Sequence, residues 1–250
     1  MVSSLIKMAV GLVYMAASAV VHGLILLALT PSRNLRIRAS NYWGWVSGRF
    51  CMWLSGSTVT IHGGEHFDGA RPAIYISNHT SIHDIFIGIW QAPVGTVGVA
   101  KKEVVWLPFF GQLYWMSGHL RIDRGNHERA MASMRDLEDI VRRYRLSIWM
   151  WPEGTRARDG RLQPFKKGLY HLAVHTGLPV VPVIVRGAHL AWRKGSFVIR
   201  GVPIEVEALP AISTAGWADR DPDVCMEELH ALFAQHLPPD QQPLTAGAAA

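Results

Sequence analysis

The chain has 250 residues, of which 49% are hydrophobic and only 18% are charged. This length accommodates one sizeable α/β core with an appendage but not two ordinary enzyme domains, and the composition excludes disordered and collagen-like chains. Lys and Arg number 25 against 19 Asp and Glu, so the net charge of +6 favours an anionic partner, such as a phosphate, a nucleic acid or an acidic lipid surface. Cys51 and Cys225 are the only cysteines, which excludes a disulfide framework and a cysteine-rich zinc site and favours a reducing compartment.

The first predicted element is an apolar helix near the N-terminus. Residues 8–30 contain no charged side chain except the titratable His22, and about 20 apolar residues suffice to cross a bilayer. A cleaved signal peptide is the main alternative, because Ala17-Ser18-Ala19 has the small-residue pattern of a cleavage site. The apolar run continues to Leu29, well past that pattern, which argues against cleavage. Three arginines follow the run and only Lys7 precedes it, which predicts that the rest of the chain lies in the cytoplasm.

A second helix is predicted over residues 42–54, which are rich in aromatic side chains and carry Arg49 as their only charge. The chain has ten Trp residues and a positive mean hydropathy, and both observations favour a helix at a membrane interface. Pro31 and Ser32 break the chain between the two helices. Three arrangements stay open: a helical hairpin dipped into one leaflet, a membrane span followed by a surface helix, or two core helices of a soluble protein.

Beyond the second helix, short β-rich runs alternate with helical ones. This pattern predicts an α/β fold with a mixed, largely parallel sheet flanked by helices and preceded by the membrane-associated hairpin. We expect anchoring helices in residues 1–56, a catalytic α/β domain in residues 57–237 and a flexible tail in residues 238–250. A helix is predicted over residues 127–144, capped by Asn126. The predicted strands are residues 58–62, 73–77, 96–100, 120–123, 146–151, 180–185 and 197–206.

The first cluster of chemically active side chains follows the second predicted strand. We expect residues 77–84 to form a turn into a helix capped by Ser81 or Thr80, with His79 in the turn and Asp84 in the first helical turns. The carboxylate would then reach back to one imidazole nitrogen, fix the tautomer and stabilise the imidazolium that forms when the other nitrogen accepts a proton. Such a pair is a general base with its orienting carboxylate, without a protein nucleophile.

Two other interpretations of this turn stay open. His79 and His83 are four residues apart, which is the spacing of two zinc ligands on one helical face. Thr80, however, stands where a zinc protease needs its glutamate base. Alternatively, the two histidines serve only to cap and pack the turn.

The second cluster is Trp151-Pro152-Glu153-Gly154-Thr155-Arg156, which follows an apolar run. We expect it at the carboxyl end of a central strand, where open α/β sheets bind their ligands. Gly154 allows backbone amides to approach an anion closely, and Arg156 can donate two hydrogen bonds to a phosphate. With further cations at predicted strand ends, the cluster predicts a phosphate-sized anion near the histidine. These cations are Lys101, Lys102, Arg121, Arg124, Lys166 and Lys167.

In order and approximate spacing, four blocks resemble those of the glycerolipid acyltransferases, and look most like bacterial 1-acyl-sn-glycerol-3-phosphate acyltransferases. The resemblance covers roughly residues 74–185, and residues 101–116 also look like that subgroup. Two departures are Ala157, where the family commonly has Ser, and Arg121, where it usually has an apolar residue. The four blocks are Asn78-His79 through Asp84, residues 118–124, Trp151 through Arg156, and Val181-Pro182-Val183.

The resemblance implies that His79 is the general base and Asp84 its partner. We also expect the backbone amides near residues 80–82 to stabilise the oxyanion that forms on the attacked carbonyl. The Glu-Gly-Thr-Arg block and the basic residues are expected to bind the glycerol phosphate of the acceptor. The expected substrate-binding residues are Asn78, Lys101, Lys102, Arg121, Arg124, Glu153, Gly154, Thr155 and Arg156.

The implied reaction moves a fatty acyl group from acyl-CoA or acyl carrier protein thioester to the sn-2 hydroxyl of lysophosphatidate, at the cytoplasmic face of the inner membrane. The expected product is phosphatidate, and neither a metal, a cofactor beyond the thioester co-substrate, nor a nucleic acid is expected. One alternative is acylation of another lysolipid, such as lyso-ornithine lipid or a lysophospholipid. Another is a membrane-anchored metal-dependent hydrolase that uses His79 and His83. A non-catalytic protein that binds anionic lipid or nucleic acid would explain the charge but leave the His79 and Glu153 blocks without a role.

Overall fold

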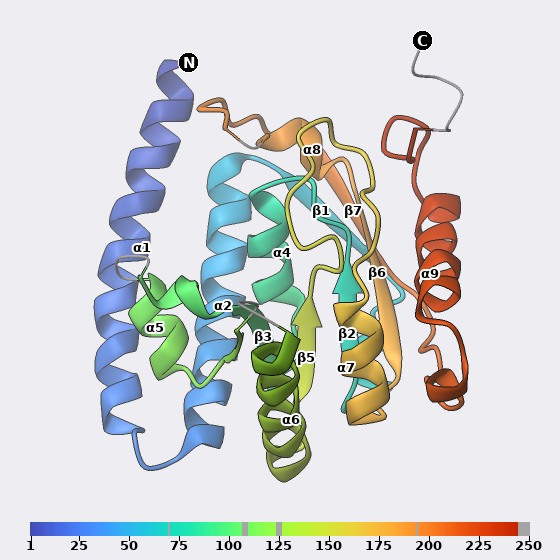
Figure 1. Ribbon diagram of the computed structural model, residues 1–250. Helices are drawn as coiled ribbons and strands as arrows, with labels where there is room; N and C mark the ends of the chain where they lie inside the picture. Colours follow the sequence, from blue (N-terminus) through green and yellow to red (C-terminus); the bar gives the residue numbers. More distant parts are fainter. Residues whose placement is uncertain (70, 107–109, 124–126, 194, 245–250) are drawn as a thin grey trace.

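The computed structural model describes residues 1–69, 71–106, 110–123, 127–193 and 195–244. Within them, seven strands form one sheet in the order β1-β7-β6-β2-β5-β3-β4 (Figure 1). Neighbouring strands run parallel except β6 and β7, so the sheet is mixed and largely parallel, as predicted. The strands are β1 (Thr58–His62), β2 (Ile74–Ser77), β3 (Thr96–Lys101), β4 (Leu120–Ile122), β5 (Ser147–Met150), β6 (Val180–Arg186) and β7 (Pro203–Ala208).

The first six predicted strands are confirmed, each with bounds within one residue of those expected. The prediction of a strand over residues 197–206 is wrong in its first part, because β7 begins only at Pro203. The backbone ahead of Pro203 is bonded elsewhere: the N–H of Ile199 donates to the hydroxyl of Ser4, 3.1 Å away on the N-terminal helix. Residues 197–202 therefore contact the N-terminal helix through Ile199 and do not extend β7.

Helices cover both faces of the sheet. In β2, Ile74 and Ile76 belong to a core that also contains Leu137 and Phe233, whereas Tyr75 belongs to a core on the other face. Strands buried on both faces are continuously apolar, as β2 and β6 are. Around the sheet lie α3 (His66–Gly69), α4 (His83–Gln91), the 3-10 helix η1 (Lys102–Trp106), α5 (Phe110–Met116), α6 (His127–Tyr144), α7 (Gly168–Thr176), α8 (Ala188–Ala191), the 3-10 helix η2 (Trp217–Asp219) and α9 (Pro222–His236).

The N-terminal helices form a hairpin, with α1 (Val2–Ala28) on the outside of α2 (Arg33–Ser55) (Figure 1). Ser32 lies in the break between them, and its hydroxyl accepts a hydrogen bond from the N–H of Leu35, 3.3 Å away, which caps α2. The second helix therefore begins nine residues before the predicted start at residue 42. The predicted helix over residues 127–144 is confirmed as α6, and its predicted cap, Asn126, lies outside the described residues.

Two glycines bring α2 into close contact with α4. A Cβ atom at Gly48 would lie 2.4 Å from the carbonyl oxygen of Phe86, and one at Gly44 would lie 2.9 Å from the carbonyl oxygen of Ile89. At the same end of the sheet, the amide of Asn41 donates to the carbonyl of Thr96 at the start of β3. The inner helix of the hairpin is thus packed directly onto the helix that follows the His79 turn.

The segment after α9 is also bound to the sheet. Gln241 is fully buried, and its side-chain oxygen accepts a hydrogen bond of 2.8 Å from the N–H of Gly187, just after β6. Its backbone carbonyl accepts another from the N–H of Leu162. These contacts lie in the first part of the predicted tail at residues 238–250, of which residues 245–250 lie outside the described residues.

We predict that Gly48→Ala destabilises the fold. In a helix interior, alanine is normally about 1 kcal/mol more stabilising than glycine. Here, however, the new methyl group would meet the carbonyl oxygen of Phe86, which cannot move away without shifting α4. We expect a net loss of about 2 kcal/mol in the free energy of unfolding, measured by denaturant titration in detergent. Gly23→Ala is the matched control, because its Cβ would lie 3.6 Å from a Leu113 methyl group. Equal stability of the two variants would contradict the prediction.

Candidate active site

The polar side chains singled out in the sequence follow strands that run in one direction. Strands β2, β3, β4, β5 and β6 are mutually parallel through their shared neighbours, so their carboxyl ends meet at one edge of the sheet. His79 follows β2, Lys102 follows β3, and Glu153 follows β5. The topology therefore collects the predicted blocks at a single edge, which is where open α/β sheets bind ligands.

His79 and Asp84 form the predicted pair. The Nδ1 atom of His79 lies 3.2 Å from Oδ2 of Asp84, and the two residues are 8% and 1% exposed. With Nδ1 directed at the carboxylate, the Nε2 atom is the one left to accept a proton. A carboxylate five residues along the chain can reach the ring because the turn folds back onto the first residues of α4.

The same oxygen of Asp84 also closes the turn. It accepts hydrogen bonds from the backbone N–H groups of Thr80, at 2.5 Å, and Ser81, at 2.7 Å. The expected cap is found only in part: the hydroxyl of Ser81 accepts from the N–H of His83, while the hydroxyl of Thr80 is buried with no partner among the described residues. Asp84 therefore orders both the backbone and the imidazole of the catalytic turn.

The prediction that amides near residues 80–82 stabilise an oxyanion is wrong for this arrangement. The N–H groups of Thr80 and Ser81 already donate to Asp84, and that of Ile82 donates to the carbonyl of Trp192, 3.4 Å away. The sequence showed a helix start, but it did not show that the helix's own carboxylate occupies these donors.

Asn78, predicted to bind substrate, uses both ends of its side-chain amide within the protein. Its Nδ2 donates to the carbonyl of Val185 and its Oδ1 accepts from the N–H of the same residue, each at 2.8 Å. The side chain is fully buried. Asn78 thus ties the start of the catalytic turn to β6, next to Gln241, whose amide also donates to the carbonyl of Val185.

Glu153 makes direct contact with the backbone of His79. Its Oε1 accepts a hydrogen bond of 2.5 Å from the N–H of His79, and its Oε2 accepts one of 3.0 Å from the N–H of Gln163. Burial raises the pKa of Glu153 to about 8, although both N–H groups act to lower it. The ring of Trp151 stacks on the imidazole of His79 with centroids 4.7 Å apart.

The rest of the Glu-Gly-Thr-Arg block lies in the loop beyond Glu153. Gly154 has a φ of +71°, a conformation that glycine adopts without strain, and a Cβ there would lie 3.0 Å from the ammonium nitrogen of Lys166. Thr155 and Arg156 continue the loop and remain predicted substrate contacts. Lys166 is thus held against this block, whereas its neighbour Lys167 is paired on the surface with Asp223, 2.8 Å away.

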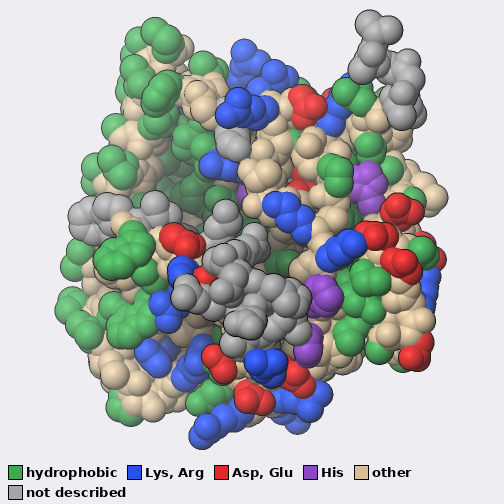
Figure 2. Space-filling view, in the orientation of Figure 1, with side chains coloured by type: hydrophobic (Ala, Val, Ile, Leu, Met, Phe, Trp, Pro, Cys, Tyr) green, Lys and Arg blue, Asp and Glu red, His purple; other side chains and the backbone are tan. Residues whose placement is uncertain are grey.

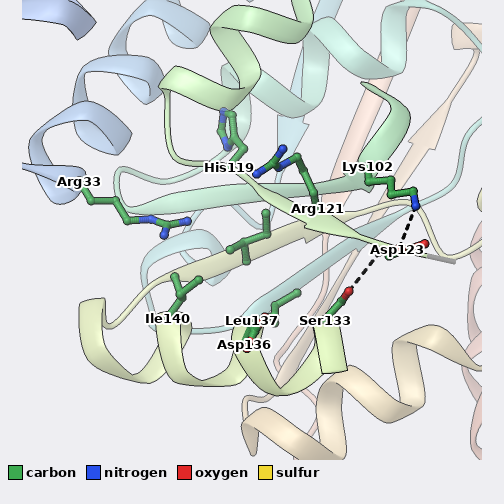
Figure 3. A pocket seen from close by; sticks show the side chains of 10 residues that line it. Arg33, Lys102, His119, Arg121, Asp123, Ser133, Asp136, Leu137 and Ile140 are labelled. Carbon is green, nitrogen blue, oxygen red and sulfur yellow. Dashed lines mark hydrogen bonds and ion pairs between the residues drawn. The ribbon is translucent and has the colours of Figure 1, made fainter. Parts of the chain in front are cut away.

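Lys102 and Arg121, predicted to join the same anion site, line a separate pocket beside the edge strand β4. This pocket has a volume of about 370 Å³ and is also lined by Arg33, a residue that the sequence analysis did not select (Figure 3). Two strands separate β4 from β2 in the sheet, so β4 lies about 14 Å from the strand that precedes His79. Arg124 and the side chain of Lys101 lie outside what the structure describes.

The charge of this pocket is partly compensated. Lys102 pairs with Asp123 at 2.8 Å, and Arg33 donates to the carbonyl of Gly118 at 2.6 Å. Burial is the main cause that lowers the pKa of Arg33, and the nearby positive charge of Arg121 lowers that pKa further. His119 adds no charge near neutral pH, because burial lowers its pKa to about 4 and its Nδ1 accepts a hydrogen bond.

Another cavity lies between the hairpin and α4. It has a volume of about 360 Å³ and a mostly apolar wall that includes Met8, Leu12, Leu54 and Phe86. His83 forms its polar corner, and burial lowers the pKa of this imidazole to about 4. Across the described residues, no group of three or more His, Cys, Asp or Glu is arranged to hold a metal ion.

Comparison with known proteins gives consistent matches. The family model described as Acyltransferase matches residues 58–186, which is more than half of the chain. The 1-acyl-sn-glycerol-3-phosphate acyltransferase of Limnanthes douglasii is 48% identical over 227 residues, covering 91% of this chain and 80% of the relative. The protein of the same name from Cocos nucifera is 44% identical, covering 97% and 78%.

Two bacterial proteins extend the comparison. The 1-acyl-sn-glycerol-3-phosphate acyltransferase of Escherichia coli K12 is 47% identical over 115 residues, covering 45% of this chain and 46% of the relative. The crystal structure of the LPA acyltransferase PlsC from Thermotoga maritima superposes with a TM-score of 0.75 at 19% identity, covering 94% of this chain and 96% of that one, and shows the same fold. On the family match and the 48% identity to a relative of which it covers 80%, the chain belongs to the glycerolipid acyltransferase family.

Proposed function

We propose that the protein transfers a fatty acyl group from a thioester to the sn-2 hydroxyl of 1-acyl-sn-glycerol-3-phosphate, which yields phosphatidate for phospholipid biosynthesis. The observation that carries the proposal is the buried His79 and Asp84 pair at the carboxyl edge of the sheet. The names of the relatives with 44% and 48% identity support lysophosphatidate as the acceptor. The acyl donor is acyl-CoA or acyl carrier protein thioester, as a co-substrate and without a further cofactor.

In the proposed reaction, Nε2 of His79 accepts the proton of the acceptor hydroxyl while the hydroxyl oxygen attacks the thioester carbonyl. The imidazolium is stabilised by Asp84, whose Oδ2 faces Nδ1 at 3.2 Å. The tetrahedral intermediate then collapses, the carbon–sulfur bond breaks, and the departing thiolate takes the proton from Nε2. The products are the ester and a free thiol, and His79 returns to its neutral form.

The acceptor phosphate has two candidate sites in this arrangement. Gly154, Thr155 and Arg156 follow β5, the strand next to the one that precedes His79, so we assign the phosphate of lysophosphatidate to that block. Lys102 follows β3 and Arg121 lies in β4, two and three strand spacings from β2, or about 10 and 14 Å, at the pocket of Figure 3. We therefore assign this pocket to a second anionic group, such as a phosphate of the thioester donor, and not to the glycerol phosphate.

We further propose that the hairpin lies in one leaflet at the cytoplasmic face of the membrane. Within the described residues, α1 is the helix long and apolar enough to cross a bilayer, and Figure 2 shows hydrophobic side chains along the margin where it lies. However, α1 lies against the catalytic unit at Ser4, which bonds to Ile199, and at Gly23, where a Cβ would lie 3.6 Å from Leu113 of α5, and these two positions are about 28 Å apart along the helix. A spanning α1 would draw that unit into the hydrocarbon, so an in-plane helix fits better.

The reaction is tested with purified protein in detergent, lysophosphatidate and labelled oleoyl-CoA or oleoyl acyl carrier protein. We expect labelled phosphatidate from the wild type and a loss of at least a thousandfold in His79→Ala, because the general base is removed. Parallel reactions use other lysolipids and a chelator. Product only from another lysolipid would reject the proposed acceptor, and chelator-sensitive hydrolysis without acyl transfer would favour the metal-dependent hydrolase.

Asp84→Asn is expected to lower kcat by two to four decades. The amide keeps the shape of the carboxylate but removes the charge that stabilises the imidazolium on Nδ1. Its oxygen can still accept from the N–H groups of Thr80 and Ser81, so thermal unfolding should shift much less than the rate. A kcat within threefold of the wild type would exclude the proposed role of Asp84.

Membrane association is tested by sedimentation with vesicles that contain phosphatidylglycerol. We expect the triple variant Val13→Asp, Val20→Asp and Leu24→Asp to lose vesicle binding, because these exposed side chains share one side of α1. Val224→Asp, at an exposed apolar site on α9, is the control and should bind normally.

The topology of α1 is tested by labelling with an impermeant maleimide. In protein added to preformed vesicles, the cysteines of Val2→Cys and Pro31→Cys should both react. Protection of one of them would indicate a spanning helix.

A further inference from the structure

We propose that Glu153 is a positioning residue, which fixes the backbone of His79 from the loop after β5, and that it does not contact the acceptor. The proposal rests on the acyltransferase reaction above. It differs from the substrate-binding role that the family resemblance implied for this glutamate. Both backbone polar groups of His79 are held by this one loop, and Glu153 makes one of the two contacts.

The loop after β5 forms hydrogen bonds with both the N–H and the carbonyl of His79. The N–H of His79 donates to Oε1 of Glu153 at 2.5 Å, and the carbonyl of His79 accepts a hydrogen bond of 2.9 Å from the N–H of Ala157. The indole of Trp151, at the start of the loop, stacks on the imidazole with an angle of 20° between the planes. The loop thus sets the backbone position and the ring plane, while Asp84 sets the direction of Nδ1.

The carboxylate of Glu153 has little left to offer a substrate. Its second oxygen accepts from the N–H of Gln163, so the side chain joins the two halves of the loop. The residue is only 1% exposed. A ligand could reach the remaining lone pairs only by opening this loop and exposing the buried side chain.

The departure at position 157 fits the same account. Ala157 is buried, and its contribution to the site is its backbone N–H. The family's usual serine at this position can make the same bond, so the side chain is free to differ. The loop is in turn held at Leu162, whose N–H donates to the carbonyl of the buried Gln241.

Glu153→Gln and Glu153→Asp test the proposal by separating kcat from KM. The amide nitrogen of glutamine cannot accept a hydrogen bond, and aspartate is too short to reach both N–H groups, so each variant loosens His79. We expect kcat to fall tenfold to a hundredfold in both variants while KM for lysophosphatidate stays within twofold, since misplacing a catalytic group lowers the rate and not the binding. Asp159→Asn is the matched control, an exposed carboxylate in the same loop, and should match the wild type.

Two results would overturn the proposal. One is a rise in KM for lysophosphatidate that exceeds the fall in kcat, which would identify Glu153 as an acceptor ligand. The other is an unchanged kcat in both variants. If Glu153→Gln shows no cooperative thermal unfolding, the Glu153→Asp variant, which keeps a carboxyl group, decides alone. Wild-type protein that acylates a different lysolipid would reject the proposed acceptor only, and the variants would then be compared on the lipid that is used.

Discussion

A single carboxylate oxygen, Oδ2 of Asp84, determines the conformation of the catalytic turn. It accepts from the imidazole of His79 and from two backbone N–H groups, and it is almost completely buried. Because a buried carboxylate is costly unless it is hydrogen-bonded, the turn is stable only in the conformation that supplies these donors. The same conformation leaves Nε2 of His79 as the nitrogen that accepts the proton in the proposed reaction. Folding of the turn and preparation of the base are therefore one event.

The parallel sheet extends this local order to the rest of the site. Helical crossovers return strands β2 to β6 in the same direction, so residues that are far apart in the sequence meet at one edge of the sheet. From that edge, Asn78 is bonded to β6 and Glu153 to the backbone of His79. Two residues of the family's motifs are thus used within the protein itself.

Much of this arrangement could be predicted from the sequence. Short apolar runs located six strands, and the spacing of His79 and Asp84 predicted their pairing, because both signals are local. What escaped prediction depends on contacts distant in sequence. Ile199 is hydrogen-bonded to Ser4, 195 residues away in the sequence, so residues 197–202 do not form the predicted strand. The separation of Lys102 and Arg121 from His79 follows from the order of the strands in the sheet, which no sequence motif encodes.

The close packing of α2 on α4 links two functions that look separate in the sequence. Gly44 and Gly48 leave no space for the two helices to slide, and α4 begins with the residues that hold the base. Under the proposed placement of α1 in one leaflet, Nε2 of His79 would keep a fixed height relative to the bilayer surface. A lysolipid could then present its headgroup without leaving the membrane. In that placement the hairpin would both anchor the protein and set the distance between His79 and the bilayer surface.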